Sequence, residues 1–137
     1  TSMHFQSLLD TDILSELFKG HERVATEASA YIRQHGNITI SAITKYEILK
    51  GLKTKKASKQ ISAFQTFCSL NDVLPITDAA IEKASDIYAE LKEKGNLISD
   101  ADILVAAISM VNDYVLISNN TNHFSRIEGL RLDNWKK

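Results

Sequence analysis

Short apolar runs typical of β-strands alternate with longer helical patterns along the chain. The short runs fall at residues 7–9, 37–41, 73–76 and 114–118, with a last one at 130–132. The longer patterns predict helices at 12–19, 22–34, 44–53, 58–70 and 77–94, and one more helix that begins near residue 99. Strands separated by helices indicate an α/β fold with a mainly parallel sheet.

Details of the pattern add to this prediction. Pro75 lies in the run at 73–76, and because proline cannot donate to a ladder it indicates an edge strand or a strand end. Gly95 follows the helix at 77–94 where a C-terminal cap is expected. The helix that begins near residue 99 is apolar nearly all round, from Ile103 to Ile108, so we expect it to be central.

Composition sets limits on the function. The 137 residues suffice for one domain, which we expect over residues 3–137, with Thr1 and Ser2 as additions outside it. The one cysteine, Cys68, is expected to fill core space and not to form a disulfide, and this indicates a cytoplasmic protein. No apolar run is long enough to span a membrane. The formal net charge of −1 means that a polyanion must be held by a local patch or a metal ion.

Four oxygen-bearing side chains follow the predicted strands or open the helices next to them. Asp10 ends the first strand, Glu47 comes just after the second, Asp102 opens the apolar helix and Asn120 follows the strand at 114–118. Ligands bind beyond the carboxyl ends of the strands in an open parallel sheet, so these side chains are expected to converge. Clustered carboxylates need a cation, and hard oxygen ligands suit Mg²⁺ or Mn²⁺.

Each acid also has a structural alternative. Thr44 with Glu47, and Ser99 with Asp102, have the spacing of capping boxes. Asp12 is interpreted as the cap of the first helix, whereas Asp10 has no evident capping role. Asp102 stands directly before six apolar residues, where an unpaired charge is costly, so the joint pattern favours one site over separate helix caps.

Four segments, in order, resemble one known family. They are "LLDTDILSELFKG", "ITISAITKYEILKGL", "GNLISDADILVAAIS" and "VLISNNTNHFSRIEGLRLDNW", which together span nearly the whole chain. They are similar to the PIN-domain ribonucleases, specifically the VapC-type toxins of toxin–antitoxin pairs. The resemblance implies a small αβα sandwich, a parallel central sheet flanked by helices, and a divalent-metal-dependent endoribonuclease.

By motif position the resemblance implies roles for individual residues. The family's acids fall on Asp10, Glu47 and Asp102, with Asp10 and Asp102 holding Mg²⁺ directly and Glu47 binding the metal or its water. The fourth acidic position of many PIN domains falls on Asn120, a departure that leaves three charged ligands and favours a single ion. Hydrolysis of RNA is then expected to leave a 5′-phosphate and a 3′-hydroxyl.

Four further residues are expected around these ligands. Thr11 and Ser118 occupy positions where small hydroxyls orient the acids or the waters of the metal. Asp12 is expected to add to the negative potential. Asp100 lies two residues from Asp102, a helical spacing that points to a different face, so we expect it to be a cap or an outer group.

The sequence and the resemblance also predict contacts with partners. A basic stretch is a candidate for RNA phosphate contacts or a solvated face, and it contains Lys50, Lys53, Lys55, Lys56 and Lys59. His123 is a candidate substrate contact, whereas Trp135 is expected to pack. The resemblance further implies a homodimer, a VapB-type antitoxin whose tail occupies the groove beside the acids, and structured RNA such as tRNA as the target.

Several alternatives remain open at this stage. A PIN-fold housekeeping nuclease and a PIN module that only binds a partner share the same motifs. The opening Asp-x-Asp also begins haloacid-dehalogenase-type phosphatases, but Leu14 stands where that family has threonine or valine, and only 19 residues follow Ser118. A receiver-type signalling domain would need an aspartate where Ser41 stands.

Overall fold

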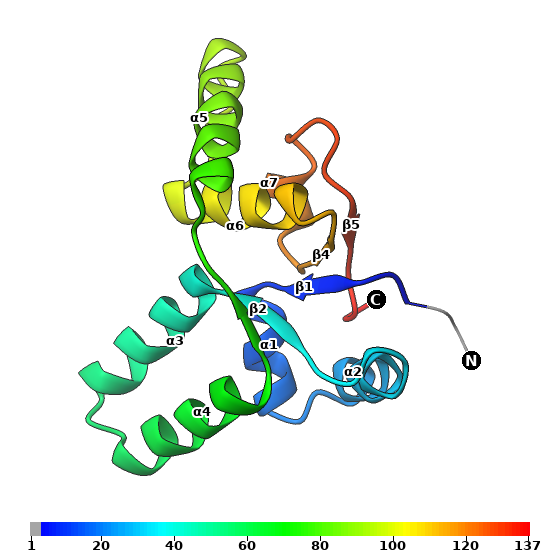
Figure 1. Ribbon diagram of the computed structural model, residues 1–137, viewed down its shortest axis with the longest axis vertical. Helices are drawn as coiled ribbons and strands as arrows, with labels where there is room; N and C mark the ends of the chain where they lie inside the picture. The colour runs from blue at the N-terminus through cyan, green and yellow to red at the C-terminus, as the bar shows by residue number, and fades with distance from the viewer. Residues whose placement is uncertain (1–3) are drawn as a thin grey trace.

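Parallel strands form the centre of the molecule in the computed structural model, which describes residues 4–137 (Figure 1). These described residues contain β1 (Ser7–Leu9), β2 (Thr39–Ser41), β3 (Asp72–Leu74), β4 (Val115–Ile117) and β5 (Leu132–Asp133). One parallel ladder has the order β1-β4-β5, and a second pairs β2 with β3. β2 lies against β1, so the two ladders follow one another across the molecule. The predicted α/β fold with a parallel sheet is confirmed.

Helices cover both sides of the strands. They are α1 (Thr11–Phe18), α2 (Glu22–His35), α3 (Ala42–Thr54), α4 (Ser58–Leu70), α5 (Asp78–Glu93), α6 (Asp100–Val111) and the short α7 (Thr121–Phe124). In Figure 1, α5 and α6 lie above the strands, and α1, α2 and α4 lie below them. α3 and α4 pack against each other as a hairpin that extends away from the sheet (Figure 1). This is the αβα arrangement that the resemblance implies.

The core is divided by the strands into two halves. Successive strand residues point to opposite faces of a sheet. Leu8 and Leu116 accordingly pack with α5 and α6, whereas Leu9 and Ile117 pack with α1 and α2. The predicted central position of α6 is confirmed, because Ile103 and the four residues from Val105 to Ile108 are all buried. Trp135 is 2% exposed and Cys68 lies against the second half, so both pack as expected.

The predicted boundaries lie within two residues of those in the structure, both for the helices and for strands such as β3, which was predicted at 73–76; the short α7 was not predicted. α4 occupies the predicted residues, β3 ends directly before Pro75, and Gly95 follows α5 with a φ of +67°. α3, however, begins at Ala42 because the Ser41 hydroxyl accepts a hydrogen bond from the amide of Thr44. α1 begins at Thr11 and not at residue 12.

Two further expectations from the sequence concern membrane-spanning segments and the first two residues of the chain. Within residues 4–137, the helices lack the combination of length and apolar character that crossing a membrane requires. The expectation that Thr1 and Ser2 do not belong to the domain lies outside the described residues.

Tyr31 connects α2 to the first strand, and this contact generates a prediction for stability. Its buried hydroxyl accepts a hydrogen bond of 3.0 Å from the amide of Ser7. Tyr31→Phe should lower the free energy of unfolding by about 1–3 kcal/mol, because the Ser7 amide is left buried without its acceptor. Urea unfolding measures the change, and Tyr88→Phe on exposed α5 surface serves as the control. Equal stability of the Tyr31 variant and the parent would show that this hydroxyl does not hold the strand.

Candidate active site

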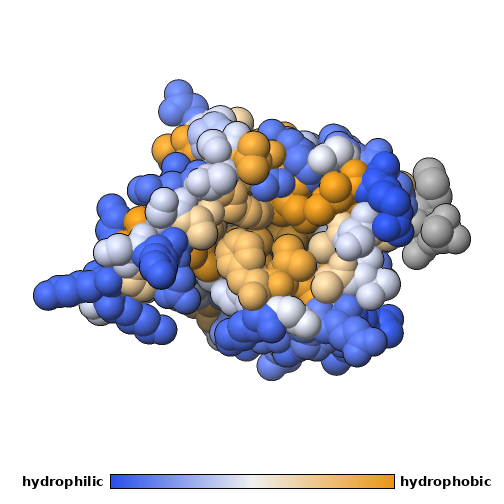
Figure 2. Space-filling view, turned by 90° about the horizontal axis from the view of Figure 1, so that it is seen from below, coloured by the Kyte–Doolittle hydropathy of each residue, from blue (hydrophilic) through white to orange (hydrophobic). Residues whose placement is uncertain are grey.

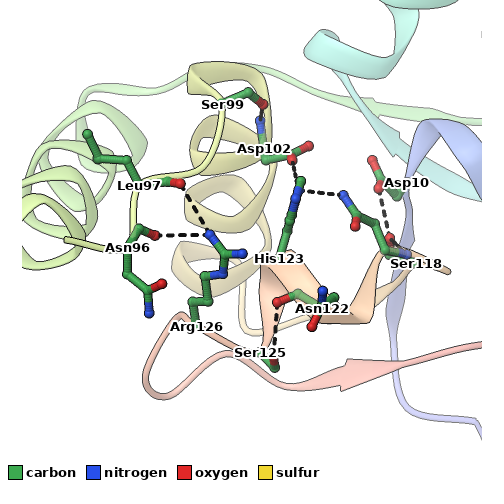
Figure 3. Close-up of polar contacts among 11 residues, drawn as sticks. Asp10, Asn96, Leu97, Ser99, Asp102, Ser118, Asn122, His123, Ser125 and Arg126 are labelled. Carbon is green, nitrogen blue, oxygen red and sulfur yellow. Dashed lines mark hydrogen bonds and ion pairs between the residues drawn. The ribbon is translucent and has the colours of Figure 1, made fainter. Parts of the chain in front are cut away.

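The candidate site lies at the carboxyl ends of β1 and β4. Asp10 directly follows β1 and Ser118 directly follows β4, and the two strands are neighbours in one ladder. Asp102 lies in the first turn of α6, which runs beside them. In Figure 3, the side chains of Asp102, His123, Ser118 and Asp10 are turned toward one another. Residues more than a hundred positions apart are thus brought to one edge of the sheet, as the parallel topology predicts.

Asp10 is the most buried acid of the site. Its residue is 7% exposed, and each carboxylate oxygen accepts one hydrogen bond. Oδ1 accepts from the amide of Thr11 at 2.8 Å, and Oδ2 accepts from the hydroxyl of Ser118 at 2.9 Å. The Ser118 hydroxyl in turn accepts from the amide of Asn120 at 3.0 Å. The carboxylate is therefore fixed in orientation by the first residue of α1 and by the residue that follows β4.

Burial raises the pKa of Asp10 from its ordinary value of 3.8 to about 7. The negative charge of Asp12 and, to a smaller extent, that of Asp102 act in the same direction. The hydrogen bonds from Thr11 and Ser118 oppose the shift but do not cancel it. The ionised carboxylate is thus destabilised where it lies, and a cation would relieve that cost.

The roles of Asp10 and Asp12 in capping are the reverse of those interpreted from the sequence. Asp10 is the N-cap of α1, so the statement that it has no capping role is wrong. Asp12 lies inside the helix, where its Oδ2 accepts a hydrogen bond of 2.9 Å from the amide of Asn119. Burial raises the pKa of Asp12 as well, against the effect of its bonds to the Asn119 and Ile13 amides. Asp12 therefore joins α1 to the loop after β4.

The side chain of Glu47, on α3, is held by a hydrogen bond from the first residue of α1. Its Oε1 accepts a hydrogen bond of 2.5 Å from the Thr11 hydroxyl. The same hydroxyl lies 3.0 Å from the hydroxyl of Thr44, and since a hydroxyl has one hydrogen, Thr44 acts as the donor in that second contact. The expected capping box of Thr44 and Glu47 is wrong, because α3 begins earlier and places Glu47 in its second turn.

Thr44 is a site residue that the sequence argument missed. The sequence predicts it as part of a capping box, but it is fully buried and supports Thr11, which supports Glu47. Its spacing of three residues from Glu47, which suggested the cap, is also the helical spacing that puts both on one face. That spacing was the signal that could have found it.

Asp102 is joined to Asn120 through His123. His123 Nδ1 lies 3.4 Å from Asp102 Oδ2 and 2.9 Å from the side-chain nitrogen of Asn120. One ring nitrogen cannot donate to the carboxylate and accept from the amide at once. A proton on Nδ1 therefore requires the carbonyl oxygen of Asn120 to face the ring. At the start of α6, the Ser99 hydroxyl accepts from the Asp102 amide at 3.2 Å, which is the N-cap half of the predicted capping box.

The remaining predicted residues lie further out. Asp100 is exposed in the first turn of α6. The predicted lysines are all exposed, on α3, on the turn after it and at the start of α4. Among them, Lys55 lines a groove next to the site, as described below. The basic stretch is thus divided between different surfaces.

A groove of about 590 Å³ lies between α1, α3 and α4. Its lining residues are Thr11, Ser15, Phe18, Lys19, Glu47, Ile48, Gly51, Leu52, Lys55, Gln60, Ala63, Phe64 and Phe67. Figure 2, seen from below, shows hydrophobic residues gathered in a hollow with hydrophilic residues around it. The rings of Phe18 and Phe67 meet edge to face with centroids 5.2 Å apart. Thr11 and Glu47 border the groove, so it opens directly beside the acids.

The donor set suits a divalent cation held mainly by water and by one or two carboxylates. Asp10 and Asp102 interact electrostatically, and both offer hard oxygen atoms. Within residues 4–137, no three acidic, histidine or cysteine side chains gather closely enough to form a complete cage. Mg²⁺ does not need one, because it usually keeps several waters in protein sites. The residues therefore fit Mg²⁺ with incomplete protein coordination.

Comparisons with known proteins identify the family and the fold. The PIN domain family model matches residues 7–130. Ribonuclease VapC2 of Haemophilus influenzae is 30% identical over 129 residues, which cover 93% of this chain and 96% of that protein. The tRNA(fMet)-specific endonuclease VapC of Shigella flexneri is 28% identical over 129 residues, with the same two coverages. The structure of DNA-bound VapBC from Salmonella typhimurium matches with a TM-score of 0.84 at 25% identity, covering 96% of this chain and 98% of that one.

The raised pKa of Asp10 predicts how the metal-free protein responds to pH. The folded-state pKa of about 7 exceeds the ordinary 3.8, so the fold loses stability as pH rises through that interval. Above it the loss amounts to about 4 kcal/mol. In EDTA near pH 8, Asp10→Asn should therefore be more stable than the parent by about 2–4 kcal/mol, and the gain should shrink toward about pH 4.

Urea unfolding at several pH values measures this difference. Asp100→Asn, at an exposed position two residues before Asp102, is the matched control and should show no such pH-dependent gain. A metal-free Asp10→Asn protein less stable than the parent near pH 8 would contradict the prediction.

Proposed function

The chain belongs to the PIN-domain family, in its VapC-type ribonuclease branch, and on this premise we propose that it is a Mg²⁺-dependent endoribonuclease toxin restrained by a VapB-type antitoxin. The observation that carries the catalytic part is the buried Asp10 carboxylate, fixed by Ser118 and Thr11 and placed within the field of Asp12 and Asp102. A nuclease site of this kind needs carboxylates held in position before the metal and the substrate arrive.

The chain's own residues divide the work of the reaction. Asp10 and Asp102 would hold Mg²⁺, which when bound supplies an activated water and neutralises charge on the phosphodiester. Ser118 keeps the Asp10 carboxylate in one orientation. Thr11 does the same for Glu47, which would bind the metal or its water. Asn120 lies where many PIN domains have a further acid, so it adds a neutral polar group to the site.

For the substrate we propose a structured RNA such as a tRNA, cut in the cytoplasm. The support is the Shigella relative, which at 28% identity is named a tRNA(fMet)-specific endonuclease. Because the chain has a net charge of −1, phosphates would have to be held by local lysines such as the exposed Lys50 and Lys53 of α3.

The partner that we propose for the groove is an apolar segment of the antitoxin. The similar structure from Salmonella contains VapB together with VapC. The groove is lined by three phenylalanines and is of the kind that takes an amphipathic helix. Since Glu47 borders it, a segment bound there would lie against the acidic site. We also propose that the toxin forms the homodimer that its family resemblance implies.

Two alternatives within the family differ in what they do and not in their fold. A housekeeping nuclease would cleave RNA without an antitoxin, and a binding module would not cleave at all. Membership of the PIN family sets aside the phosphatase and receiver interpretations.

Loss of either principal carboxylate should abolish cleavage. Asp10→Asn and Asp102→Asn should reduce the rate of RNA cleavage by roughly a hundredfold or more, because each removes a charged ligand. Asp12→Asn should cost only about tenfold, since it weakens a link between α1 and the loop after β4. Excess EDTA should stop the parent, and added Mg²⁺ should restore it. Cleavage that proceeds equally well in EDTA would refute the metal-dependent mechanism, and an active Asp10→Asn would refute the ligand assignment.

The groove gives a separate test of the antitoxin. Gly51 lines it, and an added Cβ there meets no atom within 4 Å. Gly51→Trp should therefore fill the groove, abolish co-purification with a co-expressed VapB-type antitoxin, and leave cleavage intact. Gly51→Ala is the matched control and should retain both properties. Co-purification of the Trp variant at the parent's level would place the antitoxin elsewhere.

A further inference from the structure

Helix α3 presents two different surfaces on the two sides of Glu47. From this helix and its C-cap, the groove is lined by Glu47, Ile48, Gly51, Leu52 and Lys55. Four of the α3 residues that are absent from that lining form a second stripe, which we call the Tyr46 stripe: Ile43, Tyr46, Lys50 and Lys53. Their spacings of three, four and three residues place them along one face of a helix.

The Tyr46 stripe starts where α3 meets α6. Ile43 packs against the half of the core that contains Ile103 of α6, and α3 and α6 are in contact. Tyr46 is one turn further along and directly precedes Glu47. Asp102 lies in the first turn of α6. The stripe therefore leads out from the acidic site on the side opposite the groove.

Tyr46 is exposed although it lies beside a catalytic centre. Its residue is 61% exposed, which is a large apolar ring left in water. The ammonium of Lys50 lies 5.0 Å from the ring centroid, so the aromatic face already has a cation next to it. Lys53 continues the stripe with a second exposed charge.

An exposed ring beside lysines fits a single-stranded nucleic acid better than it fits protein. Bases stack on aromatic side chains whatever their sequence, and lysines pair with the backbone phosphates. Near an acidic site, such cations also offset the repulsion between carboxylates and phosphates. A second copy of the chain fits less well, because a two-fold interface on the stripe would bury Lys50 and Lys53 of both copies, and lysine is depleted from protein–protein interfaces.

We propose that the Tyr46 stripe binds RNA next to the cleavage site, with an unpaired base stacked on Tyr46 and the adjoining phosphates against Lys50 and Lys53. This inference rests on the proposed ribonuclease function and makes it more specific. Stacking on Tyr46 would select substrates in which the nucleotide beside the scissile bond is not base-paired in a duplex. Unpaired loops satisfy that condition, whereas uninterrupted helices do not.

Binding of RNA by an uncleaving protein tests the proposal. In the Asp10→Asn background, Tyr46→Leu should weaken binding of a short mixed-sequence single-stranded RNA by roughly tenfold, the size expected for one stacked base. Tyr46→Phe and Tyr46→Trp should retain affinity, because they keep the ring. A 2-aminopurine reporter in the strand should lose fluorescence when it binds the Asp10→Asn protein and should not do so when it binds the same protein with Tyr46→Leu.

The chain supplies a matched control on another helix. Tyr88 on α5 is 39% exposed and has Lys92 at 5.8 Å from its ring centroid, the same residue pair at the same spacing. Tyr88→Leu should leave RNA affinity unchanged. Lys50→Gln should lower the salt dependence of binding by the equivalent of about one phosphate contact.

The possible failures are distinguishable. If the Asp10→Asn protein binds no RNA and the parent cleaves none, the proposed function fails. If cleavage is metal-dependent but Tyr46→Leu binds RNA as well as its parent, only the inference about the Tyr46 stripe is overturned. A change of oligomeric state in Tyr46→Leu, measured by light scattering, would instead make the stripe an interface between copies and would also overturn it.

Discussion

The buried carboxylate of Asp10 is the constraint on which the site depends. Its two oxygens accept hydrogen bonds from α1 and from the end of β4, so one side chain fixes the geometry of three elements. The same burial makes its charge costly and raises its pKa to about 7. Stability and function therefore oppose each other in the metal-free protein, because the ionised carboxylate that would bind a cation is also the one the fold disfavours.

The sequence predicted the fold well wherever periodicity was the deciding signal. α4 and the apolar α6 follow from it, as does the alternation that sends Leu8 and Leu9 to opposite halves of the core. The errors fall where a strand joins a helix with no loop between them. Asp10 and Ser41 each end a strand and cap the next helix, so no turn residues mark the boundary. Which neighbour acts as the cap is then decided by tertiary contacts, such as the bond between Asp12 and the Asn119 amide.

The convergence of the acids could be predicted because it follows from topology, but their partners could not. Parallel strands bring their carboxyl ends together whatever side chains they carry. The contact of Asp102 with His123, in contrast, depends on how α7 is turned against α6. The support of Glu47 by Thr11 and Thr44 depends likewise on the approach of α1 to α3. Helical spacing alone predicts which residues share a face of a helix, but not which element packs against that face.

Asn120 shows how a change at one position fits the electrostatics of the whole site. Its backbone amide donates to Ser118, whose hydroxyl donates to Asp10, and its side chain meets the ring that contacts Asp102. A carboxylate in its place would add a third negative neighbour to Asp10, which Asp12 and Asp102 already destabilise. The amide keeps the hydrogen-bonded connection between the acids without that charge. The cost would be a weaker attraction for the proposed Mg²⁺, so the positioning of Asp10 and Asp102 would have to supply more of its binding.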